Sequence, residues 1–450
     1  MKQHVNLLEG PIFPALSKLA LPIMGTSLIQ MAYNMTDMIW IGRVGSSAVA
    51  AVGAAGMYMW LSNGIATLSR MGGQIKVAHS LGAKDQETAA VYAQSALQMG
   101  ILSGIIYGIL AILFNGPLIA FFKLNSPQVI ADARVYLVIT CGLILFSMLN
   151  QILTGIFTAM GNSQTPFLAT AVGLVINIVM DPVLIFGIGP IPKLGVAGAA
   201  IATVFAQMIV TLMFILAARK DFHIFDKVHL LSRPRTGYMG TIARIGVPMC
   251  IQNLIFTGIS MVIARIIAGW GDTAVAVQKV GSQIESISWM AADGFSAAVN
   301  SFVGQNYGAH NIKRVKQGYR TAVGVALIWG LMTTLILVFL PQYIFRIFIP
   351  EEAVIPMGVD YLRILGFSQM FMCMEIMTSG AFSGMGRTIP PAVEGVVLTS
   401  ARIPLALALS ATALGLNGIW WSISISSILK GLILVTWFLL FFRHLERRKG

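Results

Sequence analysis

Hydrophobic residues dominate this chain in long runs, and polar residues gather in the short stretches between them. A run of roughly 20 apolar residues is long enough to cross a bilayer as an α-helix. By this criterion the pattern predicts twelve transmembrane helices and an all-α polytopic membrane protein. The predicted helices lie near residues 15–43, 47–77, 89–114, 129–160, 164–187, 193–218, 240–268, 273–304, 319–344, 357–386, 391–412 and 416–442.

The composition agrees with this class. Of the 450 residues, 56% are hydrophobic and only 10% are charged, whereas about a quarter of the residues of a soluble domain are charged. The net charge of +13 does not indicate a nucleic-acid partner, because the basic residues lie in loops and at the chain end, as at a membrane surface. Three cysteines, Cys141, Cys250 and Cys373, lie in apolar runs and are expected to pack there as thiols.

Lysine and arginine concentrate in alternate loops. They cluster in 218–238, in 311–316 and in 443–449, where the last group includes Arg448 and Lys449. The loops on the opposite side carry few basic residues. The positive-inside rule therefore predicts a multi-pass protein of the plasma (inner) membrane with both termini in the cytoplasm.

The two halves of the chain repeat each other. With an offset of 226 in the numbering, Pro22 falls on Pro248 and Ala48-Val49-Ala50 falls on Ala274-Val275-Ala276. Further along, an offset of 225 places Tyr136, Phe146, Gly155, Phe157, Gly161 and Pro166 on Tyr361, Phe371, Gly380, Phe382, Gly386 and Pro391. A nearly constant offset through five helices indicates duplication.

The duplication predicts two six-helix lobes. We expect an N-terminal lobe at 1–217, a cytoplasmic basic linker at 218–238 and a C-terminal lobe at 239–450. Because six is even, both lobes enter the membrane from the same side, and a pseudo-two-fold axis along the membrane normal relates them. Rocking of two such lobes about a central site is one way to alternate access.

Two carboxylates lie inside apolar helices of the first half, at Asp37 and Asp181. Asp37 is as far from Arg43 as Asp181 is from Gly187, at the outer ends of their helices, so the two acids share a depth. Asn177 lies one turn before Asp181, and Thr203 lies in roughly the same layer. Such a set suits a hard cation, or one proton shared by two close acids. The alternative for Asp181 is that it caps a helix break at Pro182, but acids inside a membrane are functional by default.

The second half lacks these acids. By the offsets, Asp37 corresponds to Ile263 and Asp181 to Ala406, so cation binding is expected in the first lobe only. The second half has other charges within its predicted helices, and which of them are functional stays open: Lys279, Glu285, Asp293, Glu375 and Arg402. Glu375 is as far from Gly386 as Arg402 is from Pro391, at the inner ends of their helices, so these two side chains share a depth. We therefore predict that they form a buried ion pair that holds the helices together.

Several of these features together resemble one family. They are the Pro22-to-Asp37 spacing, Met180-Asp181-Pro182, Leu81-Gly82-Ala83, Tyr307-Gly308-Ala309 and the duplication. In order and spacing they are similar to the multidrug and toxic-compound extrusion (MATE) transporters over essentially the whole chain. The resemblance implies export of diverse, often cationic amphipathic compounds, driven by inward flow of Na⁺ or H⁺.

The resemblance also implies site residues. The positions that match the family's N-lobe cation site are Asp37, Asn177, Asp181 and Thr203, which would hold H⁺ or Na⁺. The NorM-like branch carries an acid in helix ten where this chain has Met372, so the DinF-like branch is favoured.

A substrate chamber is suggested by composition. The chain has 25 methionines and 24 phenylalanines, and thioethers can repack around varied ligands. The candidate lining residues are Tyr33, Asn34, Met57, Asn150 and Met372. The alternative is that such residues fill helix interfaces or face lipid.

Other functions are less favoured. The chain lacks GxSxG, HExxH and P-loop motifs, and its six histidines fall in loops or at membrane edges, so we expect no enzyme and no cofactor other than the coupling ion. The alternative is a lipid-linked saccharide flippase, which would need a basic cavity, whereas the first lobe offers acids. The expected partners are small-molecule drugs or dyes and the bilayer. The sequence leaves the oligomeric state open, with a monomer as the default.

Overall fold

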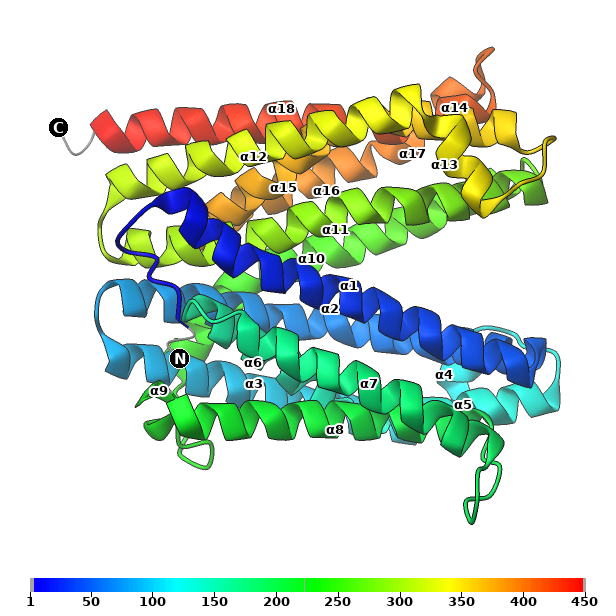
Figure 1. Cartoon of the computed structure of the whole chain (residues 1–450), viewed down its shortest axis with the longest axis horizontal. Helices are drawn as coiled ribbons and strands as arrows, with labels where there is room; N and C mark the ends of the chain where they lie inside the picture. Colours follow the sequence, from blue (N-terminus) through cyan, green and yellow to red (C-terminus); the bar gives the residue numbers. More distant parts are fainter. Residues whose placement is uncertain (1–3, 222, 448–450) are drawn as a thin grey trace. The chain divides into compact units, whose positions relative to one another are not determined.

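The computed structural model describes residues 4–221 and 223–447, and every regular element in this part of the chain is an α-helix (Figure 1). Arg448 and Lys449, part of the predicted basic end, lie outside the described residues. The helices are α1 (Ile12–Val44), α2 (Ser46–Gly82), α3 (Gln86–Leu113), α4 (Asn115–Ala120), α5 (Pro127–Gly142), α6 (Leu145–Ala159), α7 (Gln164–Phe186), α8 (Val196–Asp221), α9 (His223–Asp226), α10 (Thr236–Ala268), α11 (Asp272–Gly308), α12 (Ile312–Phe339), α13 (Pro341–Phe348), α14 (Ile355–Gly366), α15 (Gln369–Gly384), α16 (Ile389–Ser400), α17 (Arg402–Ser410) and α18 (Leu416–Arg447).

Each of the twelve predicted segments is helical, but four of them are divided. The fourth consists of α5 and α6, which meet at a bend of 43°. The ninth, tenth and eleventh consist of α12 with α13, α14 with α15, and α16 with α17. Within the described residues, nine helices are long and apolar enough to cross a membrane, or ten when the bent pair is one span. The chain is an all-α polytopic membrane protein.

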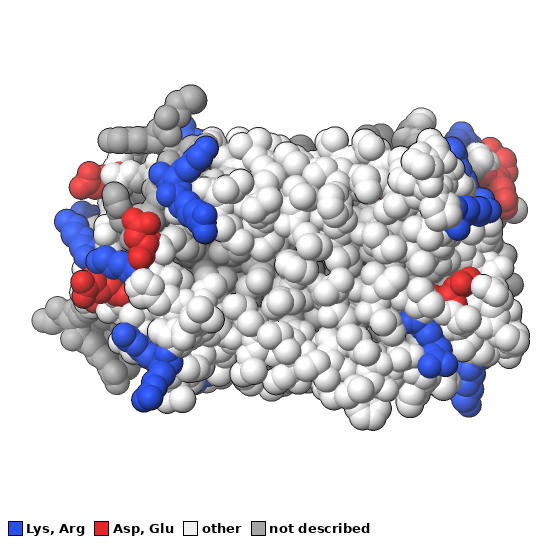
Figure 2. Space-filling model, turned by 90° about the horizontal axis from the view of Figure 1, so that it is seen from below, with Lys and Arg blue, Asp and Glu red and all other residues white. Residues whose placement is uncertain are grey.

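Individual helices show why the surface suits lipid. On α3, Gly104 and Gly108 are buried against the neighbouring helices, whereas Ile106 and Leu113 on the other face are exposed. A helix that buries small residues and exposes large apolar ones is oriented for a membrane and not for water. On the face shown in Figure 2, the charged side chains gather toward both ends and leave an uncharged band between them.

The chain divides into two compact units. The first comprises the described part of Met1–Glu9, Leu21–Cys250 and Gly308–His310, and the second comprises Gly10–Ala20, Ile251–Tyr307 and the described part of Asn311–Gly450. The first half of α10 packs within the first unit, where Gly246 lies against the backbone of Leu68.

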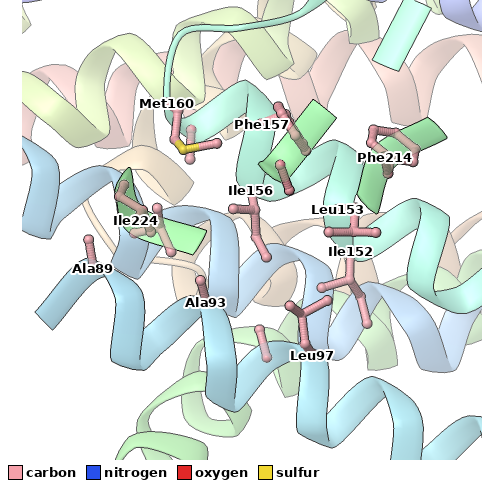
Figure 3. Close-up of a cluster of buried hydrophobic side chains, with 14 of the residues drawn as sticks. Ala89, Ala93, Leu97, Ile152, Leu153, Ile156, Phe157, Met160, Phe214 and Ile224 are labelled. Atoms are coloured by element: carbon pink, nitrogen blue, oxygen red, sulfur yellow. The ribbon is translucent and has the colours of Figure 1, made fainter. Parts of the chain in front are cut away.

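Each unit has its own apolar core. In the first unit, small residues of α3 such as Ala93 lie against Ile156 of α6, and Phe157 packs on Phe214 of α8 with ring centroids 5.5 Å apart (Figure 3). In the second unit, Tyr361 of α14 meets Trp420 of α18 edge to face at 5.1 Å. These cores fix the helices that carry the polar residues described below.

The duplication is visible in local geometry. Lys84 and His310, which the offset of 226 relates, both adopt the left-handed conformation, with φ of 59° and 57°. Each precedes a helix cap: Asp85 accepts a hydrogen bond from the Thr88 amide at the start of α3, and Asn311 caps α12 in the same way. The repeat therefore preserves turn and cap geometry as well as residue identity.

Candidate functional site

The four predicted cation-site residues come from three helices of the first unit. Asp37 lies on α1, Asn177 and Asp181 lie on α7, and Thr203 lies on α8. Asn177 and Asp181 are fully buried, Thr203 is 4% exposed and Asp37 is half-buried. The structure brings all four together.

Hydrogen bonds connect the members of this set. The Thr203 hydroxyl donates to Asp37 Oδ2 at 3.5 Å, and the Asn177 amide donates to Asp181 Oδ1 at 3.3 Å. Asp181 and Asn177 also lie close enough to Asp37 to interact with it electrostatically. Because Asn177 and Asp181 are one turn apart on α7, their side chains share one helix face.

Asp181 lies inside an unbroken helix. α7 continues through Pro182 to Phe186 without a break, so Asp181 does not cap a helix break. The second unit has apolar residues at the corresponding positions, with Ile263 and Ala406 both buried. The pair of acids is thus a feature of the first unit.

Three buried oxygens of this site have no hydrogen-bond partner within the described part of the chain: Asp37 Oδ1, Asp181 Oδ2 and Asn177 Oδ1. A buried polar atom without a partner costs free energy unless a ligand satisfies it. Carboxylate, amide and hydroxyl oxygens are the ligands that hard cations prefer. A proton shared by the two adjacent carboxyls satisfies the two carboxyl oxygens of this set. The residues present therefore fit either Na⁺ or H⁺.

Aromatic and amide side chains surround these acids. Tyr33 lies one turn before Asp37 on α1, and its side chain lies beside Thr203 and Gln207. Tyr136 of α5 is 3% exposed and close enough to Asp37 to interact with it electrostatically. Neither Gln207 nor Tyr136 was predicted as a site residue, although Gln207 follows Thr203 by one turn on the same helix face.

The five predicted substrate residues do not form one group. Asn34 and Met57 are exposed, and Tyr33 lies beside the acids as described. Asn150 is 7% exposed: it donates to the Gln207 carbonyl and side chain, and its Oδ1 accepts from Thr211. Met372 is half-buried in the second unit.

In the second unit, the prediction that Glu375 and Arg402 form an ion pair is wrong. Glu375 pairs instead with Lys430 of α18 at 3.1 Å, and Arg402 donates to Ser426 Oγ at 2.6 Å and Ser427 Oγ at 3.1 Å. The prediction used depth along the helices, but the direction of the side chain around each helix decides the partner.

The other predicted charges of this unit differ in burial. Glu285 accepts hydrogen bonds from the Tyr361 hydroxyl at 3.0 Å and the Gln369 amide at 2.7 Å. Lys279 and Asp293 are exposed. Two buried charges were missed by the sequence analysis, Glu394 at 4% exposed and Lys430 at 6% exposed, although each stands inside an apolar run.

The comparison with family models gives two matches. The MatE family model matches residues 22–183 and again residues 248–408. The first residues of the two segments differ in number by 226 and the last residues by 225, which are the offsets of the repeat. The same family model therefore describes each half.

Relatives match over nearly the full length. The chain is 28% identical over 410 residues to a probable multidrug resistance protein NorM of Thermotoga maritima, with 90% of this chain and 87% of the relative covered. It is 25% identical over 441 residues to an FAD transporter of Shewanella oneidensis, with 96% and 95% covered. In fold it is similar to a crystal structure of MATE in the bent conformation, with a TM-score of 0.91, 23% identity, and 100% and 99% covered. The branch within the family stays a prediction.

Proposed function

Because the chain belongs to the MATE family, we propose that this multidrug efflux transporter is a cation-coupled antiporter that exports amphipathic, often cationic compounds by alternating access. The observation that carries the proposal is the buried acid pair Asp37 and Asp181, with three unpartnered oxygens around it in the described part of the chain. H⁺ and Na⁺ are both retained as the coupling ion.

The chemistry of the acid pair supports exchange. Two ionised carboxylates in apolar surroundings are costly unless a cation or a proton neutralises them. The Thr203 hydroxyl and the Asn177 amide donate to the acids and hold their orientation. A coupling ion and a cationic compound are both attracted to the negative charge of the two acids. They therefore compete for it, and binding of one favours release of the other.

Helix geometry supports coupling of this charge to movement. Asp37 is on α1, whereas Asp181 and Thr203 are on α7 and α8, which pack along each other. Ion binding therefore joins α1 to this helix pair, and ion release leaves two acids that repel each other. The contact between α1 and the α7–α8 pair would then have two states, one with the ion bound and one without it, and an ion gradient can shift the balance between them.

We place the protein in the plasma (inner) membrane with both termini in the cytoplasm, on the basis of the positive-inside pattern. Small-molecule drugs or dyes are the proposed cargo, no nucleic acid takes part, and a monomer suffices. The flippase alternative is not carried further, because the first unit presents acids where an anionic headgroup needs basic residues.

The test is dye efflux from proteoliposomes under an imposed pH gradient and, separately, an imposed Na⁺ gradient. We expect one gradient to drive efflux by the wild type, and Asp37→Asn to reduce it to the rate of empty liposomes. Asp132→Asn is the matched control, because it makes the same chemical change in the first unit, at a half-buried position outside the candidate site, where Asp132 accepts from Gln128. FAD is tested as a second cargo because one relative is named for it. Efflux that persists in Asp37→Asn, or efflux that neither gradient drives, overturns the proposal.

A further inference from the structure

The second unit contains a group of five charged side chains, three of them buried and two half-buried, here called the charge cluster. It consists of Glu285 on α11, Glu375 on α15, Glu394 on α16, Arg402 on α17 and Lys430 on α18. Electrostatic interactions connect them, since Arg402 faces all three acids and Glu394 faces Glu375 and Lys430. None of them belongs to the first-unit site.

Two of the three carboxylates in the charge cluster have donors. Glu375 accepts a hydrogen bond from the Lys430 ammonium at 3.1 Å, with side chains 12% and 7% exposed. Glu285 accepts from Tyr361 and Gln369. Such bonds stabilise the ionised form of a carboxyl group.

Glu394 differs from both. It is 4% exposed, and neither of its carboxyl oxygens has a hydrogen-bond partner among residues 4–221 and 223–447. The ionisable groups that face it are Glu375, Lys430 and Arg402. The fourth helix against α16 is α10, which presents the uncharged Gln252 beside Gly395.

The charges of the cluster do not balance when all five groups are ionised. With every member ionised, three carboxylates face two cations, and one negative charge remains in a buried place. A buried charge without compensation is strongly unfavourable. One proton makes the charge cluster neutral, and Glu394 is the carboxyl that loses no hydrogen bond by accepting it.

We infer that Glu394 is a proton-binding site, so that the second unit takes up and releases a proton of its own. A metal cation does not suit the position, because the ammonium of Lys430 and the guanidinium of Arg402 stand beside the carboxyl. The proton forms an O–H bond on one oxygen of Glu394, and its release returns the carboxylate.

This site is not the repeat copy of the first-unit site. By the offset of 225, Glu394 corresponds to Ala169, which lies more than three helical turns before Asp181 on α7. At a rise of 1.5 Å per residue, the two positions are about 18 Å apart along equivalent helices. Glu394 lies in the second turn of α16, and Arg387 lies shortly before the start of that helix. The inference does not depend on what the protein exports.

The test is infrared difference spectroscopy of the full chain in lipid, with pH steps that reveal protonated carboxyl groups. The background variant carries Asp37→Asn and Asp181→Asn, which removes the first-unit acids from the spectrum. We expect a pH-dependent carboxyl band that disappears when Glu394→Gln is added and that shifts but persists with Glu394→Asp. Glu352→Gln is the matched control and leaves the band in place, because it makes the same chemical change at an exposed acid outside the charge cluster, where Glu352 pairs with Arg346.

A parallel titration counts protons with a pH-sensitive dye. The Glu394→Gln variant should release one proton fewer per chain than the background when the pH is raised. The inference is overturned if no carboxyl band or proton count depends on Glu394, or if the band survives Glu394→Gln. If Glu394→Gln does not fold, the band shift in Glu394→Asp decides the question. Loss of dye transport leaves this result unaffected, so the two proposals fail separately.

Discussion

Removal of Lys430 tests the energetics of the charge cluster most directly. Its ammonium lies 3.1 Å from Glu375, and both side chains are nearly buried. Lys430→Met keeps much of the apolar volume but leaves three carboxylates with Arg402 as the only cation in the cluster. The cluster then has to accept one proton more than it holds with Lys430 present.

The cost can be estimated in two ways. Breaking a buried pair by removing one partner destabilises proteins by about 3–5 kcal/mol. A free glutamic acid has a pKa of about 4.3, so neutralising one at pH 7 costs roughly 3.7 kcal/mol. The two estimates agree on about 4 kcal/mol at pH 7. Because the folded variant binds the extra proton, its stability rises as the pH falls, and the deficit shrinks to about 1 kcal/mol at pH 5.

Glu375→Gln is the matched control. It leaves Glu285 and Glu394 facing Arg402 and Lys430, which is neutral without any extra proton. We therefore expect a smaller loss of about 1.5–3 kcal/mol, from one charge-assisted hydrogen bond. The double variant restores the charge surplus of the wild type, so it should be more stable than Lys430→Met alone.

The measurement is the free energy of unfolding from denaturant titrations in mixed micelles at pH 5 and pH 7. Equal losses for Lys430→Met and Glu375→Gln would refute the charge count. A loss that does not depend on pH, or a double variant whose loss is the sum of the single losses, would refute it as well.

Two further predictions concern packing and capping. Gly198→Ala places a Cβ against the Leu184 carbonyl oxygen and should cost about 1–3 kcal/mol of unfolding free energy. Gly240→Ala, whose Cβ meets nothing within 4 Å, should be neutral or stabilising in the same titration. Hydrogen bonds from Thr88 lower the pKa of Asp85, so the capping stability is present above the unfolded-state pKa and is lost as pH falls through the folded-state pKa. Asp85→Ala should therefore lower the melting temperature at pH 7 and not at strongly acid pH, whereas Asn311→Ala, at the repeat position, should lower it equally at both.

Much of the fold follows from the apolar runs, because a bilayer dictates both the length and the composition of a spanning helix. The breaks within segments were not predicted. The break between α14 and α15 directly follows Gly366, and the break between α16 and α17 at Ala401 lies three residues before Pro404. Proline also occurs inside an unbroken helix of this chain, at Pro182 in α7, so packing against neighbouring helices decides which of these residues interrupts a helix.

The first-unit site was predictable for a different reason. An acid in a membrane is so costly that its presence alone points to a site, and the i, i+4 spacing then finds Asn177. The same reasoning missed Glu394 and Lys430. We paired Glu375 with Arg402 because the two lie at the same depth along their helices. In the structure, one face of α18 meets both α15 and α17, and it presents Lys430 to Glu375 and Ser426 to Arg402.

The repeat allows the candidate site of the first unit to be compared with the charge cluster of the second unit, position by position. By the offset of 225, Asn177 of the first-unit site corresponds to Arg402 of the second unit. The guanidinium of Arg402 lies 5.8 Å from the Phe256 ring centre and donates to Ser426 and Ser427. Where the first unit has an amide beside the proposed site of an exchangeable cation, the second unit therefore has a positive charge that is covalently attached. A guanidinium at that position cannot leave, so we expect no cation exchange there, and Glu394 is the one carboxyl that the two fixed cations of the charge cluster do not neutralise.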